Sequence, residues 1–242
     1  MIRVGVVGAA GRMGQQVCRT VEADPALELV AALDEGDDLT ALVEAQAEVA
    51  VDFTVVDAAR QTLMFLAQHG IHAVVGTTGF DDRDLDRFRQ AFTSSNALIA
   101  PNFAIGAVLM IRMAELAAPH FETAEIIEFH HPGKVDAPSG TATHTAERMA
   151  AASSEWTPDP TVHEVLPGAR GGVGPGTIRV HAVRMAGVVA NQEIILGTTG
   201  QTLTIRHDTV DRSSFMPGVV VGIKQVQQVA GVTVGLDAYL GL

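Results

Sequence analysis

Short apolar runs and longer periodic stretches alternate along the first part of the chain. The short runs are rich in β-branched or small residues and predict buried strands. They cover Ile2–Val7, Leu27–Leu33, Val49–Phe53, Ala73–Val75 and Ala97–Ala100. Between them, apolar residues recur at helical spacing, as at Met13, Val17 and Val21, and helices are also predicted over Val56–His69 and Asp82–Phe92. Such alternation is typical of a parallel sheet with crossover helices.

The pattern changes in the second part of the chain. Helices are predicted over Ile105–Phe121, Thr141–Ala152 and Met216–Val229, and a strand over Ala124–Phe129. A stretch rich in proline and glycine, residues 158–176, is expected to be an extended loop. Three strand-like runs with glycine turns between them predict an antiparallel or mixed sheet. They are Thr177–Arg184, Asn191–Gly197 and Thr202–Asp208.

These patterns predict an α/β protein with two domains. We expect residues 1–103 and 216–242 to form a Rossmann-like nucleotide-binding domain around the parallel sheet. We expect residues 104–215 to form an α+β domain with a mixed or antiparallel sheet, which serves substrate binding and oligomerisation. The return of the last helix to the first domain is an inference from the pattern.

Composition narrows the class of protein. An apolar content of 47% with 18% charged residues is typical of a globular protein. A net charge of −12 disfavours nucleic-acid binding, and the apolar runs are too short to span a membrane. The single cysteine, Cys18, excludes an internal disulfide and fits a reducing compartment. The strand pattern begins at once without a leader, so we expect a cytoplasmic enzyme.

A glycine-rich turn follows the first predicted strand. Gly8, Gly11 and Gly14 are spaced G-x-x-G-x-x-G and open the first helix, where free N–H groups can receive a pyrophosphate. Asp34 ends the second strand and can accept the ribose hydroxyls of a dinucleotide. A purely structural strand-to-helix turn is the alternative interpretation.

The same region bears on the choice of coenzyme. Asp34, Glu35, Asp37 and Asp38 would all repel a 2′-phosphate, and Arg12 is the one nearby cation. We therefore expect NADH to be favoured, with NADPH also used.

Two further loops follow the fourth and fifth predicted strands. They are residues 76–79, Gly-Thr-Thr-Gly, and residues 100–103, Ala-Pro-Asn-Phe. Because ligands of open parallel sheets bind at the carboxyl ends of the strands, we expect both loops at the nicotinamide end of the cofactor. Ordinary turns are the alternative.

The segment from residue 128 to residue 142 carries the densest chemistry. It holds His130, His131 and Lys134, followed by a Ser-Gly-Thr turn that opens a predicted helix. Imidazoles, an ammonium group and free backbone N–H groups suit an anionic substrate that needs a proton. Together with the glycine-rich turn, this segment indicates a reductase.

This segment also admits other interpretations. A zinc site lacks a further ligand at suitable spacing, and Lys134 would repel the ion. One histidine could merely pack, and Glu128 and Asp136 could be surface acids. Asp136 could also orient Lys134 or a histidine, or cap the next helix, a role for which Ser139 competes.

Taken together, the motifs resemble those of the dihydrodipicolinate reductase family of bacterial lysine and diaminopimelate synthesis. They are Gly8-x-x-Gly11-x-Met13-Gly14, Gly76-Thr-Thr-Gly79, Ala100-Pro-Asn-Phe103 and His130-His-x-x-Lys134-x-Asp-Ala-Pro-Ser-Gly-Thr141. The likeness extends over nearly the whole chain and is greatest to the actinobacterial branch.

The resemblance implies an NAD(P)H-dependent reductase, commonly a homotetramer, that passes hydride to C4 of a cyclic imine dicarboxylate. It makes His130 the proton donor, with His131, Lys134, Gly140 and Thr141 on the substrate, Lys134 being catalytic as well. It places the cofactor on a larger set of residues. That set is Gly8, Ala9, Ala10, Gly11, Arg12, Met13, Gly14, Asp34, Gly76, Thr77, Thr78, Ala100, Pro101, Asn102 and Phe103.

The chain departs from the family pattern in three places. Gly133 stands where many members have a histidine or basic residue, and residues 218–222 lack an arginine that some members use on the substrate. Ala10 replaces a lysine of some relatives, which weakens the case for NADPH. A non-catalytic NAD(P)-binding sensor of the same fold is the alternative function, and an aspartate- or homoserine-type dehydrogenase is a third.

Overall fold

A computed structural model describes all 242 residues, and the chain folds into two compact units. The first unit contains residues 1–105 and 212–242, and the second contains residues 106–211. The chain re-enters the first unit through a short 3-10 turn, Arg212–Phe215, a few residues before the boundary expected at residue 216. None of the helices combines the length and the apolar character that crossing a membrane requires.

The first unit is built on a six-stranded parallel sheet in the order β11-β5-β4-β3-β1-β2. Its strands are β1 (Ile2–Val7), β2 (Leu27–Leu33), β3 (Val49–Asp52), β4 (His72–Val75), β5 (Ala97–Ile99) and β11 (Val232–Val234). The chain winds outward from β1 in both directions, so the carboxyl ends of β1, β2 and β3 flank the point where the order reverses. In open α/β sheets, that point is where ligands bind.

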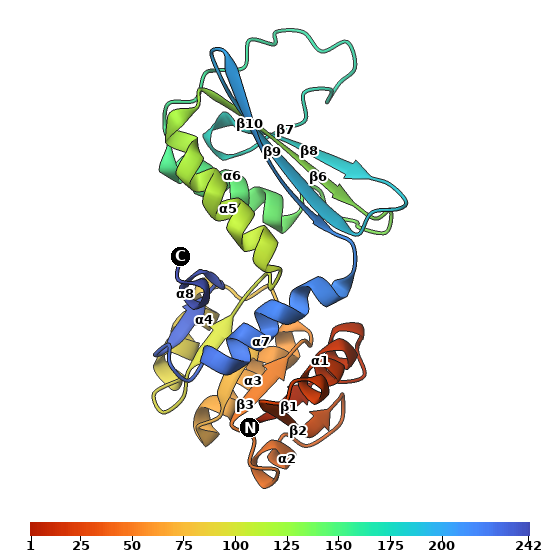
Figure 1. Cartoon of the computed structure of the whole chain (residues 1–242), viewed down its shortest axis with the longest axis vertical. Coiled ribbons are helices and arrows are strands. Elements are labelled where there is room, and N and C mark those ends of the chain that lie inside the picture. The colour runs from red at the N-terminus through yellow and green to blue at the C-terminus, as the bar shows by residue number, and fades with distance from the viewer. The chain divides into compact units, whose positions relative to one another are not determined.

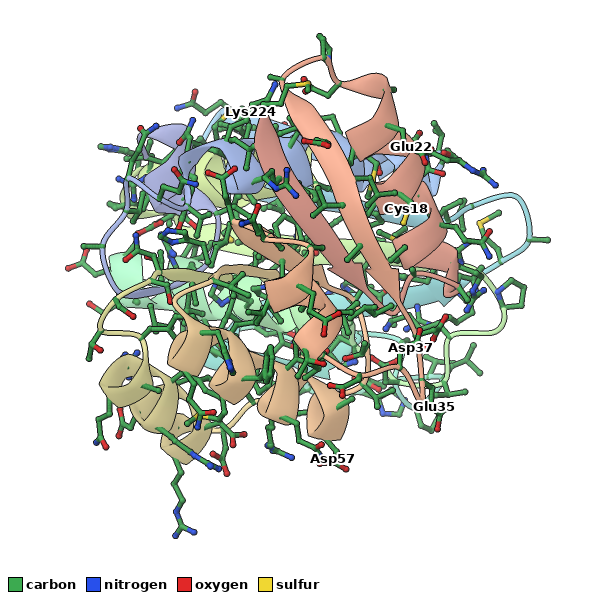
Figure 2. The ribbon with its side chains drawn as sticks, turned by 90° about the horizontal axis from the view of Figure 1, so that it is seen from below. Cys18, Glu22, Glu35, Asp37, Asp57 and Lys224 are labelled. Atoms are coloured by element: carbon green, nitrogen blue, oxygen red, sulfur yellow. The ribbon has the colours of Figure 1, made fainter.

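Helices cover both faces of this sheet (Figures 1 and 2). They are α1 (Arg12–Ala23), α2 (Thr40–Glu44), α3 (Val56–His69), α4 (Asp82–Ala91), α7 (Met216–Gln225) and α8 (Asp237–Leu240). In α1, Val17 and Val21 of the predicted apolar stripe are buried, as is Gly14, whereas Met13 is half-buried. The Rossmann-like architecture expected from the sequence is therefore confirmed.

The C-terminal segment contributes more to the first unit than one helix. Helix α7 ends at Gln225, four residues before the predicted end, and β11 then pairs with β5. Two glycines bring α7 close to its neighbours: a Cβ on Gly218 would lie 2.1 Å from the Phe103 carbonyl oxygen, and one on Gly222 would lie 2.8 Å from Leu98. Any side chain there would push the helix away.

The second unit contains a mixed sheet in the order β10-β9-β6-β8-β7. Its strands are β6 (Thr123–His130), β7 (Gly172–Val173), β8 (Arg179–Arg184), β9 (Ala190–Thr198) and β10 (Gln201–Thr209). Only β6 and β8 pair in parallel. The helices of this unit, α5 (Ile105–Ala117) and α6 (Gly140–Ala152), lie on one face of the sheet (Figure 1).

The core of this unit fills the space between the two helices and the sheet. Met110 of α5 and Met149 of α6 pack with Ile126, Ile194 and Leu196 of the sheet, and all five are almost fully buried. The helix predicted over residues 105–121 ends as an α-helix at Ala117 and continues as a 3-10 turn that contains Pro119, a residue that cannot continue the α-helical hydrogen bonds. The expected loop of residues 158–176 is largely irregular, although β7 lies within it.

Candidate functional site

The glycine-rich turn of the first unit is held tightly against the end of β2. The N–H groups of Gly8 and Ala9 both donate to the Leu33 carbonyl oxygen, at 2.8 and 2.9 Å. Gly8 has a positive φ of 81°, which favours glycine. A Cβ on Gly14 would lie 2.0 Å from the Gly8 carbonyl oxygen. The glycines at both ends of the turn are thus required for the close approach of α1 to the sheet.

The N-terminus of α1 is open to a ligand. Gly11 is the N-cap residue, and no side chain accepts a hydrogen bond from the first-turn N–H groups. The N-terminal N–H groups of a helix lack partners within the helix and favour negative charge. This is the property that a pyrophosphate site needs, so the turn fits the interpretation made from its spacing.

A pocket of about 510 Å³ lies beside this turn, within the first unit. Gly8, Gly11 and Asp34, all expected to hold the cofactor, are among its lining residues. The rest of the lining is Val7, Glu35, Gly36, Asp37, Leu39, Phe53, Thr54, Val55, Ala58, Gln61 and Thr62. The pocket is therefore bounded on one side by residues 53–55 after β3 and by the first part of α3, and on the other by the acidic turn after β2.

The acidic turn is organised by Asp34. Its Oδ2 accepts the Ala10 N–H at 2.7 Å, and its Oδ1 accepts the Glu35 N–H at 2.8 Å. Its own N–H donates to Asp37 Oδ2 at 2.8 Å. Figure 2 shows Glu35 and Asp37 together on the turn that follows β2. No lysine or arginine lines the pocket, so a ligand here meets carboxylates without a neutralising cation.

The loops after β3, β4 and β5 meet at the same edge of the sheet. A Cβ on Gly76 would lie 2.0 Å from the Phe53 ring, and the rings of Phe53 and Phe103 are 5.7 Å apart. Thr77 Oγ1 donates to Asp52 Oδ1 at 3.1 Å and to the Thr54 carbonyl oxygen at 3.0 Å. Phe53 thus contacts the expected nicotinamide loops and also lines the pocket.

Sequence reasoning missed the segment from Asp52 to Thr54. The Asp52 carboxyl is fully buried, which raises its pKa, and its Oδ1 also accepts from the Thr54 N–H and hydroxyl at 2.9 and 2.7 Å. The sequence carried a signal for it, because this segment lies at the carboxyl end of a predicted strand, as residues 76 and 100 do.

In the second unit, a fully buried carboxylate organises the predicted proton donor. Glu128 Oε2 lies 2.6 Å from His130 Nδ1, and Arg184 donates to both carboxylate oxygens at 2.7 and 2.8 Å. Burial alone would raise the pKa of Glu128, but the hydrogen bonds from Arg184 and His130 outweigh it and hold the pKa below its ordinary value. The interpretation of Glu128 as a surface acid is therefore wrong.

The turn after β6 carries the positively charged group of the site, the Lys134 ammonium group. Lys134 Nζ donates to both Asp136 carboxylate oxygens at 2.8 Å, and its N–H donates to the His131 carbonyl oxygen at 3.2 Å. The hydrogen bond from Lys134 holds the pKa of Asp136 below its ordinary value. The open question about Asp136 is thereby answered: it orients Lys134, whereas Ser139 Oγ accepts the Ala142 N–H and caps α6.

The first turn of α6 completes the anion-binding groups. The N–H groups of Gly140 and Thr141 make no hydrogen bond within the protein, and a Cβ on Gly140 would meet nothing within 4 Å. The Ser139 N–H donates to Glu128 Oε1 at 3.1 Å, which ties this turn to the carboxylate that also holds His130. No group of three or more His, Cys, Asp or Glu side chains is arranged to hold a metal ion.

Comparison with known proteins identifies the family. Residues 2–103 match the family model of the dihydrodipicolinate reductase N-terminus, and residues 106–240 match that of the C-terminus. The chain belongs to the dihydrodipicolinate reductase family. The resemblance drawn from the motifs is confirmed.

Full-length relatives support the same family. Two proteins named 4-hydroxy-tetrahydrodipicolinate reductase are similar, one from Nocardia farcinica at 55% identity and one from Corynebacterium urealyticum at 53%. Each alignment covers all of this chain, with 99% of the Nocardia protein and 100% of the Corynebacterium protein. Both genera are actinobacteria, so the expected branch is confirmed too.

Solved structures agree with the fold of this dihydrodipicolinate reductase family member. The dipicolinate-bound dihydrodipicolinate reductase from Paenisporosarcina sp. TG-14 matches with a TM-score of 0.90 and 36% identity, over 98% of this chain and 99% of that one. An amine dehydrogenase from Mycobacterium smegmatis matches with a TM-score of 0.64 at 14% identity, over 98% of this chain and 95% of that one. The second likeness shows the fold alone.

Arg184 is the member of the second unit's cluster that no motif indicated. It lies far from residues 128–142 in the sequence and reaches them because β8 pairs with β6, with Arg184 opposite His130. Its Nη2 also donates to the Asp136 carbonyl oxygen at 2.7 Å. Only strand pairing, which the sequence does not reveal, places it there.

Proposed function

We propose that this protein reduces 4-hydroxy-tetrahydrodipicolinate to tetrahydrodipicolinate with a reduced nicotinamide nucleotide, in lysine and diaminopimelate synthesis. The observation that carries the proposal is that the His130 imidazole and the start of α6 are both tied to Glu128, with the Lys134 ammonium group on the turn between them, in a chain of this family. A cyclic imine dicarboxylate needs two kinds of group. Its carboxylates need a cation and N–H donors, and its reduction needs a proton source.

The first unit fits a nicotinamide nucleotide. The open N-terminus of α1, the pocket beside it and the Asp34 carboxylate provide places for the pyrophosphate and for the adenosine ribose. Residues 76–78 and 100–103 would flank the nicotinamide. When bound, the reduced nucleotide would supply a hydride, and the protein's part is to bind and orient it.

The second unit would bind the substrate and supply the proton. Lys134 pairs with one substrate carboxylate, and the N–H groups of Gly140 and Thr141, with His131, hold the charge that remains. The 4-hydroxy substrate first loses its hydroxyl as water, which gives the conjugated imine dihydrodipicolinate. Hydride addition at C4 of this imine then leaves negative charge conjugated with the ring nitrogen, and His130 neutralises it by donating a proton. His130 is well placed for this role, because its ring is oriented by Glu128 and its side chain is 16% exposed.

An absorbance assay of NADH or NADPH oxidation with freshly generated substrate tests the activity. We expect substrate-dependent oxidation, with tetrahydrodipicolinate identified as the product by mass spectrometry. A protein that binds the coenzyme but turns over neither form would instead be a non-catalytic sensor.

We propose NADH as a coenzyme used at least as well as NADPH, and Asp34 as the residue that discriminates. Asp34→Ala should weaken NADH binding by roughly 1–3 kcal/mol through lost charge-assisted hydrogen bonds to the ribose. The same change should spare or improve NADPH binding, because it removes a charge that repels the 2′-phosphate. Calorimetric titration of both coenzymes measures the two effects.

Two further variants sharpen this test, since Asp34 also holds the Ala10 N–H. Asp34→Asn keeps an oxygen acceptor for the glycine-rich turn and removes the charge, so it should shift preference toward NADPH without disturbing the turn. Asp57→Ala removes an exposed acid of α3 outside the pocket lining and should leave the preference unchanged (Figure 2). Equal losses for both coenzymes in Asp34→Ala would mean that Asp34 only supports the turn.

We also propose that the protein is a cytoplasmic homotetramer that assembles through the second unit. The face of its sheet that α5 and α6 leave open carries half-buried apolar side chains, including Ile127, Phe129 and Ile195. Such a face suits contact between copies of the chain. Light scattering coupled to size-exclusion chromatography gives the oligomeric state, and a monomer would contradict the proposal.

A further inference from the structure

Glu128 receives four hydrogen bonds from three different parts of the second unit. One comes from the His130 ring on the same strand, two come from Arg184 on β8, and one comes from the Ser139 N–H at the start of α6. Burying a carboxylate away from solvent costs free energy unless the carboxylate is paired. We therefore expect the buried Glu128 carboxylate to have a function.

We propose that Glu128 and Arg184 are positioning residues for His130: Glu128 fixes the orientation of the ring, and the opposed charges of the two set how readily it releases its proton. This inference rests on the proposed function, in which His130 donates the proton to the substrate. Neither residue is assigned contact with substrate or cofactor.

The orientation follows from the hydrogen bond between Glu128 Oε2 and His130 Nδ1. Glu128 is held ionised by its partners, so the carboxylate accepts and Nδ1 carries the hydrogen. Nε2 is then the nitrogen whose proton is exchanged with the substrate. Because the ring is tied at one nitrogen, Nε2 keeps one direction, whereas an untied ring would turn about its side-chain bonds.

The effect on proton release by His130 follows from Arg184, the other partner of Glu128. A lone buried carboxylate beside an imidazole would stabilise the imidazolium and make it a poor proton donor near neutral pH. Arg184 binds the same carboxylate through both terminal nitrogens and offsets its charge. With its charge offset, Glu128 still accepts the hydrogen bond that orients the His130 ring, and the imidazolium can still release its proton.

The other elements around His130 add little net charge. On β9, the residues opposite His130 and Glu128 are Ala190 and Gln192, both uncharged. The turn after β6 carries Lys134 and Asp136, which pair with each other, and the exposed ring of His131. On α6, Ser139 caps the helix and Thr145 accepts from Gln192. Glu128 and Arg184 are therefore the charges that act directly on His130.

The chain contains a matched control for this cluster. Glu125 lies on the same strand and accepts from His181 Nε2 and Arg170 Nη2, both at 2.6 Å. An odd spacing along a strand places Glu125 and Glu128 on opposite faces of the sheet. Glu125→Gln thus removes a carboxylate from an equivalent Glu–His–Arg group without touching His130.

The test is the pH at which His130 loses its proton, measured in two independent ways. One is NMR titration of the His130 ring, assigned with His130→Gln. The other is the alkaline limb of kcat, where activity falls as the proton donor is deprotonated. Glu128→Gln removes the negative charge and should move both values down by about one pH unit. Arg184→Met removes the positive charge and should move both up by about as much.

Conservative variants separate tuning from folding. Arg184→Lys keeps the charge and should restore values near wild type, and Glu125→Gln should leave them in place. If Arg184→Met does not fold, Arg184→Gln removes the same charge with a smaller loss of hydrogen bonding. Shifts in one common direction, or no shift in Glu128→Gln, would overturn the inference. The NMR titration needs no turnover, so it still decides the matter if the proposed activity fails.

Discussion

Replacing Lys134 with alanine should lower kcat/KM by about 100-fold or more. The ammonium group pairs with a substrate carboxylate, and losing such a charge pair costs roughly 2–4 kcal/mol. The side chain is 19% exposed and held by Asp136, so the cation is in place before the substrate arrives. Steady-state kinetics measures the loss. Coenzyme titration should be unaffected, because Lys134 lies in the second unit.

The sequence itself provides the control. The chain has two lysines, and the other, Lys224, pairs with Asp24 at 2.6 Å within the first unit. Lys224→Ala removes an equally charged and similarly paired side chain, so it should leave kcat/KM near wild type. Comparable losses in the two variants would point to a general effect on folding. Normal turnover of Lys134→Ala would mean that the substrate carboxylate is held elsewhere.

Three elements could be predicted from the sequence to the residue. The predicted bounds of β1, β2 and α3 are those of the structure. Helix α3 illustrates the reason, since Gly70 ends it in the left-handed conformation that favours glycine at this position. The short elements α2, β7, β11 and α8 were not predicted, whereas the equally short β3, β4 and β5 were, because each of these contains a continuous buried apolar run.

The residues of the candidate site also fall into two groups, those that a local sequence pattern indicates and those that only the fold brings together. Residues 128–142 and 8–14 are continuous in sequence, so their chemistry could be read directly. Arg184 and Phe53 reach these residues only through strand pairing and loop packing, which no local pattern encodes.

Glu128 could be predicted in part from the sequence. Side chains along β6 alternate, with Ala124, Ile126 and Glu128 buried on the face that packs against the helices. The period of two therefore predicts burial for Glu128, and a buried carboxylate requires partners. The sequence could have shown that Glu128 needed a cation, but it could not have shown that the cation is Arg184.

His130→Gln should lower kcat by about 100-fold or more, with a smaller change in KM. Glutamine can still hydrogen-bond to Glu128 and fill most of the space of the ring, but it cannot donate a proton at neutral pH. The variant should also lose the alkaline limb of kcat that His130 produces in the wild type. Rates measured across the pH range, at saturating substrate and coenzyme, give both results.

His131→Gln is the paired comparison and should act mainly on KM. The His131 ring is exposed and makes no hydrogen bond within the protein, so nothing fixes its orientation as Glu128 fixes that of His130. A ring of this kind can contribute to substrate binding but is poorly placed for directed proton transfer. If His131→Gln instead loses kcat and the alkaline limb while His130→Gln changes mainly KM, the two roles are exchanged. The carboxylate beside His130 would then serve the fold of the second unit rather than the chemistry.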